Sequence, residues 1–387
     1  MALKEEKMKK LFNILSIFFI LGFAVSGALA QAPIKPGGPW LTENQQVNYT
    51  ALADYEELTK ALKQIEKTSK GLMVLESIGL TNMNRDIWMA KIGDPKKEPV
   101  MIITQQHGDE PIGTEAAVEV IKYLSTGSAQ AKKILDSIYV LIVARVNPDG
   151  AELWQRYNHD PAAPPAKTAD YLYTRAGVGW DINRYNFIDW TTSPLYAKYL
   201  SDPVKYPYPT NPVPEAVAVA GTFAKYQPLW IVDFHGQGTY VTNEGENVTN
   251  SILWPTAPGV PAGAVTLSKQ ICAAMMNYLE QYGYATLSLY PGGPEPGIAR
   301  NAYGLAGAGS VLSEFKGGIG QKSLGMLVKH AANSMMAILQ ATADSSLFTL
   351  DTERVEDLPV ERIFYYKELP PNEEIEPEWC NPKLVAI

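Results

Sequence analysis

Basic residues and cysteines are scarce in this chain of 387 residues, and no internal repeat is present. The chain has 33 Lys and Arg and 41 Asp and Glu, which gives a formal net charge of −8. This balance argues against nucleic acid as a partner, because that partner requires a basic face. The two cysteines, Cys272 and Cys380, leave both a disulfide and two unpaired thiols open. The chain also lacks the Gly-x-Ser-x-Gly motif of serine hydrolases and a phosphate-binding glycine loop.

The first thirty residues are typical of an export signal. Four lysines precede an apolar run over residues 11–27, and Ala28-Leu29-Ala30 supplies a small-residue cleavage site. A membrane anchor is the weaker interpretation, because a run of about 17 residues is at the short limit of a span. The sequence therefore predicts a signal peptide at 1–30 and a glycine- and proline-containing linker at 31–50. We expect a secreted or periplasmic protein without a stable membrane anchor after cleavage.

The rest of the chain has the pattern of a single α/β domain. Helical spacing predicts a helix over 55–70, and two alternating segments after it predict a hairpin. Further strands are expected at 100–104, 138–146, 229–234 and 310–315, and helices at 111–124, 265–282 and 324–343. Continuous apolar strands between helices predict a mostly parallel mixed β-sheet covered by helices on both faces. We assign this domain to 51–345 and the acidic, proline-containing remainder, 346–387, to a tail.

Two of the four histidines lie where a metal site would need them. His107 lies in the segment QQHGDE, with Glu110 three residues later, and His235 directly follows an apolar run. Two imidazoles and a carboxylate, with a fourth position left for water, form a catalytic rather than a structural zinc set. Asn147 and Glu314 also fall at or just past strand ends, where ligands bind in parallel sheets. The sequence therefore predicts one Zn²⁺ per chain and a hydrolase.

A series of motifs in this chain resembles the M14 zinc carboxypeptidases. The motifs are HGDE, NPDG followed by RYN, WDINRYNF, the strand-end His235 and Glu314 on the strand SVLSEF. Each motif alone is weakly specific, but their joint order and spacing are specific. The resemblance extends from near residue 51 to near residue 345. It implies the carboxypeptidase fold and hydrolysis of the C-terminal peptide bond of a peptide by a zinc-activated water.

The resemblance also implies roles for individual residues. His107, Glu110 and His235 match the zinc ligands, and Asp181 matches the carboxylate that orients the first histidine. Glu314 matches the general base, which must lie within hydrogen-bond reach of the water.

Substrate-binding residues are implied in the same way. Asn183 and Arg184 match the pair that holds the free C-terminal carboxylate, for which a guanidinium fork is suited. Tyr290 in the loop LYPGGPEPG matches the tyrosine that closes over the substrate. Tyr303 is the alternative for this tyrosine, although its position favours packing against a helix.

An insertion at 159–178 departs from the family pattern. In relatives, only a few residues separate the arginine that stabilises the oxyanion from the Asn-Arg pair. Arg156 matches that arginine by its place after NPDG, and Arg175 inside the insertion is the alternative.

Other functions remain compatible with these motifs. A zinc-dependent deacylase of N-acyl amino acids shares the His-x-x-Glu and Asn-Arg signatures, and cell-wall stem peptides are plausible substrates for an exported enzyme. A non-enzymatic binding module of this fold is disfavoured, because this chain retains every predicted zinc ligand. The side-chain preference is left open, since Arg300 near the tyrosine loop either attracts an acidic side chain or caps a helix.

Overall fold

The computed structural model describes residues 52–360, except 239, 243–244, 283–284 and 317–319, and also strand β12 (Ile363–Phe364). The predicted signal peptide, the linker, most of the predicted tail and Cys380 lie outside the described residues. Cys272 is a free, buried thiol on helix α8 (Ala262–Leu279). No helix of the described residues is long and apolar enough to cross a membrane.

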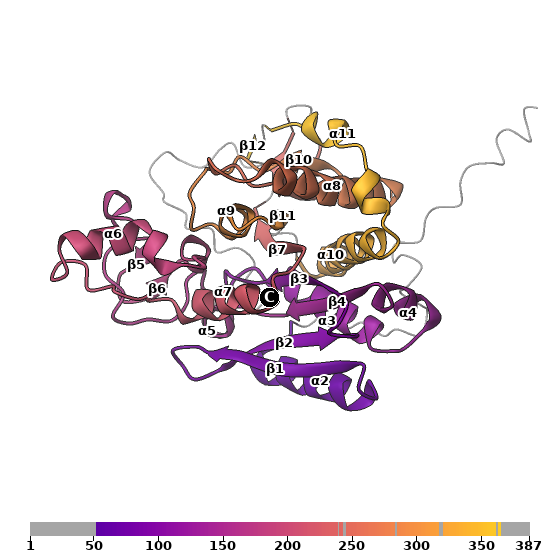
Figure 1. Ribbon diagram of the computed structural model, residues 1–387, viewed down its shortest axis with the longest axis horizontal. Helices are drawn as coiled ribbons and strands as arrows, with labels where there is room; N and C mark the ends of the chain where they lie inside the picture. The colour runs from indigo at the N-terminus through magenta and orange to yellow at the C-terminus, as the bar shows by residue number, and fades with distance from the viewer. Residues whose placement is uncertain are drawn as a thin grey trace, which may run out of the picture. The chain divides into compact units, whose positions relative to one another are not determined.

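An eight-stranded sheet organises the domain, with the spatial order β1-β2-β4-β3-β7-β11-β9-β10 (Figure 1). Strands β4, β3, β7 and β11 run parallel, while β2 and β9 pair antiparallel with the two edges of this block. The predicted hairpin is β1 with β2. The mostly parallel mixed sheet is therefore confirmed. Its strands are β1 (Met73–Leu80), β2 (Asp86–Ile92), β3 (Glu98–Thr104), β4 (Ile138–Val143), β7 (Trp230–Gln237), β9 (Asn250–Leu253), β10 (Leu287–Leu289) and β11 (Gly309–Lys316).

The central strands are apolar throughout because both of their faces are covered. Val100 and Ile102 of β3 pack into one hydrophobic cluster, and Met101 and Ile103 pack into a second cluster on the other face. Successive side chains of a strand point to opposite faces, so a strand that is buried on both sides shows no polar alternation. This is why the sequence shows continuous apolar runs at these positions.

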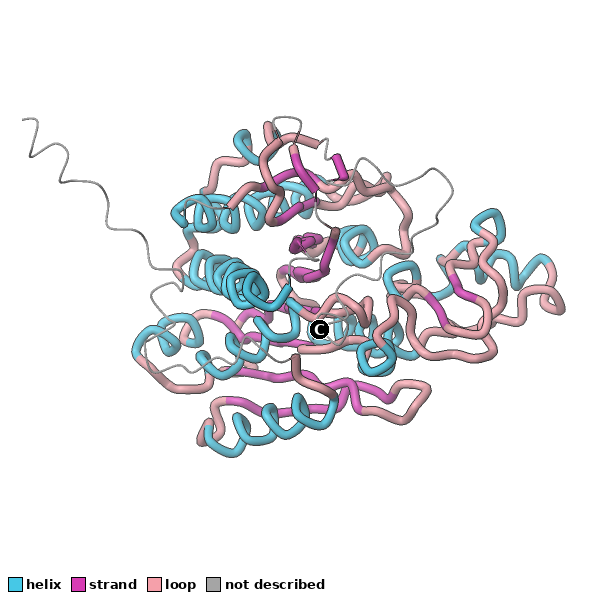
Figure 2. The backbone as a smooth tube through the Cα atoms, turned by 180° about the vertical axis from the view of Figure 1, so that it is seen from behind, coloured by secondary structure: helices cyan, strands magenta, loops and turns pink. Residues whose placement is uncertain are grey.

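Helices lie on either side of the strands (Figure 2). Helix α2 begins with a capping box, in which Asp54 and Glu57 each accept a hydrogen bond from the other's backbone N–H. One cluster is closed by α2 (Tyr55–Thr68), α3 (Ile112–Leu124), α4 (Ala129–Leu135), α8 and α10 (Gly320–Ala343). The other cluster is closed by α7 (Pro214–Tyr226), α9 (Ala299–Leu305) and aromatic residues between 163 and 213. Helices α4 and α7 and strands β9 and β10 are not among the elements named from the sequence.

The predicted insertion contributes to an aromatic-rich segment, in which α6, β5 and β6 lie together (Figure 1). Trp180 is buried there, and its ring lies edge-on to the rings of Tyr185 and Tyr208, with centroids 5.3 Å away in each case. The short elements of this part of the chain are α5 (Pro148–Leu153), η1 (Thr168–Asp170), β5 (Thr174–Arg175), β6 (Gly179–Trp180), η2 (Ile182–Arg184), η3 (Trp190–Thr192) and α6 (Pro194–Ser201).

Residues after 345 continue to pack on the domain. Leu347 and Val355 are fully buried in the first cluster, and the backbone N–H of Leu289 donates to the carbonyl of Pro359. The remaining short elements are β8 (Tyr240–Val241), which pairs with β12, together with η4 (Glu280–Tyr282), η5 (Ser346–Thr349) and α11 (Glu353–Glu356).

Candidate active site

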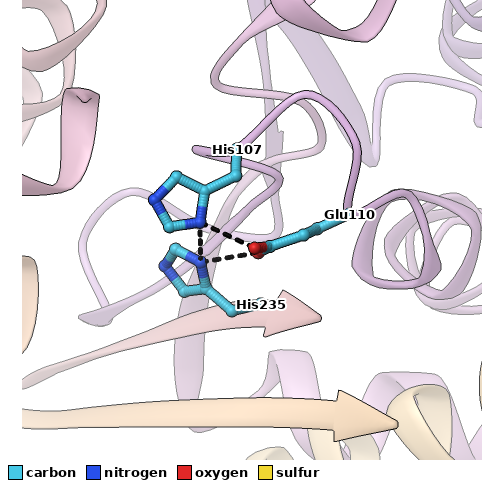
Figure 3. A group of neighbouring side chains, drawn as sticks. All are labelled: His107, Glu110 and His235. Carbon is cyan, nitrogen blue, oxygen red and sulfur yellow. Dashed lines mark hydrogen bonds and ion pairs between the residues drawn. The ribbon is translucent and has the colours of Figure 1, made fainter. Parts of the chain in front are cut away.

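His107, Glu110 and His235 converge at the carboxyl ends of two neighbouring parallel strands (Figure 3). His107 follows β3, Glu110 precedes α3, and His235 lies on β7. Glu110 places its two carboxylate oxygens 2.8 Å from His107 Nδ1 and 2.9 Å from His235 Nδ1. The two Nδ1 atoms are 3.1 Å apart. Residues 128 positions apart in the chain thus direct their donor atoms at one point.

The chemistry of these donors fits a zinc ion. Two ring nitrogens that face each other at 3.1 Å repel unless a proton or a cation lies between them. Zinc with bonds of 2.0–2.1 Å in tetrahedral geometry separates its ligand atoms by about 3.3 Å, close to the separations found here. Among the described residues, no other group of three or more histidine, cysteine or acidic residues converges in this way.

A carboxylate stands behind each imidazole. His107 Nε2 lies 3.2 Å from Asp181 Oδ1, and His235 Nε2 lies 2.6 Å from Asp233 Oδ2. Such a partner accepts the Nε2–H and leaves the Nδ1 lone pair directed at the metal position. Sequence reasoning missed Asp233. Its signal is the spacing, because a residue two positions before His235 points to the same face of the strand.

Electrostatics keep Glu110 ionised at the centre of the cluster. Burial disfavours its charge, but His107 and His235 outweigh this effect and hold its pKa far below the usual range. Burial likewise opposes a charge on His235, whereas Asp233 and Glu110 raise its pKa well above the usual value. The cluster therefore stabilises positive charge between its donors, as a cation site must.

A buried chain of hydrogen bonds holds Asp233 in place. The Tyr303 hydroxyl donates to Asn186 Oδ1 (3.1 Å), Asn186 Nδ2 donates to Gln106 Oε1 (3.0 Å), and Gln106 Nε2 donates to Asp233 Oδ2 (2.5 Å). Tyr303, Asn186 and Gln106 are fully buried. Sequence reasoning missed Gln106 and Asn186, because their partners come from distant segments and no local pattern identifies them. This chain gives Tyr303 a fixed structural position.

Arg156 lies against the first histidine. Its Nε and Nη2 donate to Asp181 Oδ2 at 3.2 and 3.0 Å, and its Nη1 lies 3.1 Å from His107 Nδ1 and 3.7 Å from Glu110 Oε1. The side chain is 37% exposed, so it is both anchored and open to solvent. Arg175, the alternative from the sequence, lies exposed on β5.

The contacts of Asn147 account for the structural role of the NPDG motif. Its Oδ1 accepts from the N–H of Gly150 and so caps α5, while its Nδ2 donates to the carbonyls of Gln106 and Tyr157, each at 3.1 Å. The amide thereby joins the segment before His107 to the segment that carries Arg156. Gly108 permits the close approach, because a Cβ there would overlap the backbone of Gly150.

The Asn-Arg pair follows Asp181 in the short helix η2. The Asn183 side chain is turned inward, with Oδ1 accepting from the N–H of Ala299 (2.8 Å) and Nδ2 3.2 Å from His235 Nε2. Arg184 is partly exposed, its Nη1 lies 4.0 Å from Asp181 Oδ2, and its guanidinium lies over the ring of Tyr173 at 5.3 Å. Tyr173 belongs to the insertion at 159–178, which therefore supplies one wall beside Arg184.

Strand register places Glu314 beside His235 in the sheet. Glu314 of β11 pairs with His235 of the parallel neighbour β7, so both side chains point to the same face from backbones about 4.8 Å apart. Glu314 is 7% exposed. Tyr290 directly follows β10 and is partly buried, with its N–H donating to the carbonyl of Ile252.

The α/β sheet therefore carries a His-Glu-His cluster at its carboxyl edge, and two imidazoles with one carboxylate are the donor set that catalytic single-zinc sites use. The sequence profile of the zinc carboxypeptidases, peptidase family M14, matches residues 58–304. The chain belongs to the M14 zinc carboxypeptidase family. The matched range includes the three predicted ligands and ends before Glu314.

Individual relatives agree with this family. A zinc carboxypeptidase of Saccharothrix mutabilis subsp. capreolus is 30% identical over 119 residues, which cover 29% of this chain and 27% of that protein. The human carboxypeptidase N catalytic chain is 24% identical over 49% of this chain and 43% of its own length. These alignments span less than half of each relative.

Solved structures share the fold. Carboxypeptidase A from Helicoverpa armigera superposes with a TM-score of 0.57 at 17% identity, covering 77% of this chain and 75% of that one. A metallo-carboxypeptidase from Burkholderia cenocepacia superposes with a TM-score of 0.54 at 17% identity, covering 77% and 71%. The predicted carboxypeptidase-like fold is confirmed.

Proposed function

We propose that this protein is a zinc-dependent metallocarboxypeptidase that removes the C-terminal residue from peptides with a free α-carboxylate. The observation that carries the proposal is the position of Asp181. This one carboxylate faces His107, accepts two hydrogen bonds from Arg156 and lies 4.0 Å from Arg184. A metal ligand, an arginine for the oxyanion and an arginine for a terminal carboxylate therefore share one anchor.

The residues of the chain have distinct tasks in this reaction. His107, Glu110 and His235 would hold zinc, which polarises a carbonyl and lowers the pKa of a coordinated water to about 7. Glu314 accepts the proton of the attacking water and returns it to the leaving amine nitrogen. Arg156 donates to the peptide oxygen as negative charge develops there.

Arg184 and the loop that carries Tyr290 bind the C-terminal residue of the substrate. The planar guanidinium of Arg184 suits a bidentate carboxylate, and Tyr173 and Asp181 restrict its orientation. Asn183 is the second carboxylate contact in this proposal and must turn its amide from Ala299 to serve it. Tyr290 closes above the bound residue. The apolar N-terminal run and its cleavage site support export to the secreted or periplasmic space.

Paired peptides with a free and an amidated C-terminus test this function. An amide leaves the Arg184 guanidinium without its carboxylate, which costs roughly 2–5 kcal/mol, or about thirty- to several-thousandfold in kcat/KM. We expect the zinc-loaded wild type to cleave only the free peptide efficiently, and Arg184→Ala to erase the difference. Arg175→Ala changes an exposed arginine of β5 and is the matched control. This variant should keep the preference for the free peptide over the amidated one. Equal cleavage of both peptides by the wild type would exclude a carboxypeptidase and leave a deacylase or another zinc hydrolase.

A further inference from the structure

Arg300 is a buried cation that the proposed reaction does not use. It is 1% exposed and lies in the first turn of α9. Its Nη2 donates to the carbonyl of Gly293 and to Thr256 Oγ1, while its buried Nε has no hydrogen-bond partner. Among the described residues, no carboxylate lies within 4.0 Å of the guanidinium.

This placement is unfavourable for a folded chain on its own. Burial of a charge without a counter-ion carries a large desolvation cost, and here burial lowers the pKa of Arg300 to about 10. Arginine caps a helix by binding its last carbonyls, whereas Arg300 lies in the first turn, where the helix dipole opposes a cation. The helix-capping interpretation is therefore wrong. A charge kept at this cost is a candidate for ligand binding.

Arg300 lies near the residues that we assign to the terminal carboxylate. The N–H of Ala299, its neighbour in the chain, donates to Asn183 Oδ1 at 2.8 Å. Glu314, Tyr290 and Glu295 favour the charge of Arg300, whereas Arg184 opposes it. The first turn of α9 thus lies beside the proposed terminal-carboxylate site.

We propose that Arg300 selects substrates with an acidic C-terminal residue, by pairing with the side-chain carboxylate of a terminal glutamate or aspartate. The inference rests on the proposed carboxypeptidase function. If Arg184 binds the α-carboxylate, Asn183 lies next to the bound residue, and Asn183 is in contact with Ala299 at the start of α9. An acidic side chain supplies a counter-ion in direct contact with Arg300. Glu295 favours the charge of Arg300 but makes no ion pair with it among the described contacts. A neutral side chain leaves the guanidinium unpaired, and a basic one is repelled.

A purely structural role predicts a different result. Through Gly293 and Thr256, Arg300 also supports the loop that carries Tyr290. Loss of this support alone would slow cleavage of every peptide by the same factor, whatever its last residue. The ratio between two C-terminal residues therefore separates recognition from support.

Two peptides that differ only in a terminal glutamate or glutamine provide this ratio, because the two side chains have nearly the same shape. The zinc-loaded wild type is expected to favour glutamate by roughly thirtyfold or more in kcat/KM. Arg300→Met should bring the ratio to about one, and Arg300→Lys should retain part of the preference. Thr256→Val is the control variant, since it removes a loop contact without changing the charge and should keep the wild-type ratio.

The outcomes are distinguishable. A wild type that cleaves both peptides equally, or prefers glutamine, overturns the role of Arg300 and leaves the carboxypeptidase intact. An Arg300→Met enzyme that is slower on both peptides with an unchanged ratio assigns Arg300 to loop support and also overturns it. Cleavage of neither peptide by the wild type contradicts the proposed function itself. The wild-type ratio requires no variant, so a variant that fails to fold does not prevent the test.

Discussion

Asp181→Asn and Asp233→Asn form a matched pair of substitutions at the metal site. Each removes a carboxylate that faces Nε2 of one of the two histidines. Loss of such a partner costs roughly 10–100-fold in metal affinity, so we expect both variants to bind zinc more weakly by that factor. Only Asp181 also anchors Arg156, through hydrogen bonds of 3.2 and 3.0 Å.

The difference between the two variants can be estimated from their contacts. Breaking a fully buried charge pair costs about 3–5 kcal/mol, but Arg156 is 37% exposed, so we expect about 2–3 kcal/mol of lost stability in Asp181→Asn. An unanchored Arg156 further lowers turnover by on the order of a hundredfold. Asp233→Asn leaves Arg156 in place, so its turnover at saturating zinc should stay close to that of the wild type.

Zinc affinity is measured by competition with a chromophoric chelator, stability by thermal unfolding, and turnover at saturating zinc on one free-carboxylate peptide. Wild-type zinc affinity in either variant would refute the assigned tautomers of the histidines. An equal loss of turnover in both variants at saturating zinc would refute the separate role of the Asp181–Arg156 pair.

Three further predictions follow from single contacts. Glu314→Gln should bind zinc as the wild type does but lose at least a hundredfold in kcat; measurable turnover near the wild-type value contradicts the assigned base. Burial raises the pKa of Glu215 from 4.5 to about 7, so the folded state holds this proton more tightly and stability falls by about 3 kcal/mol as pH rises from 4.5 to 7. Glu215→Gln should flatten this slope in thermal melts at pH 5 and pH 8, and an unchanged slope would show that other groups cause it. Gly108→Ala should push the His107 loop away from α5 and weaken zinc binding, which chelator competition detects, since the new Cβ overlaps Gly150; wild-type affinity would mean that the loop relaxes freely.

Local patterns in the sequence account for the fold and for the types of donor at the metal site. Continuous apolar runs predict strands that are buried on both faces, because such strands need no polar alternation. His107 and Glu110 are three residues apart just after one strand, and His235 lies near the carboxyl end of another. Parallel strands deliver their carboxyl ends to one edge, so this convergence is predictable without a contact map.

The partners of these residues were decided only by the tertiary structure. The sequence left Arg156 and Arg175 as alternatives; the fold brings Arg156 to Asp181 and leaves Arg175 exposed on β5. It likewise left Arg300 open, and the missing counter-ion became visible only with the packing around α9. Apolar periodicity is written into neighbouring residues, whereas the partner of a buried charge comes from segments that only the folded chain brings together.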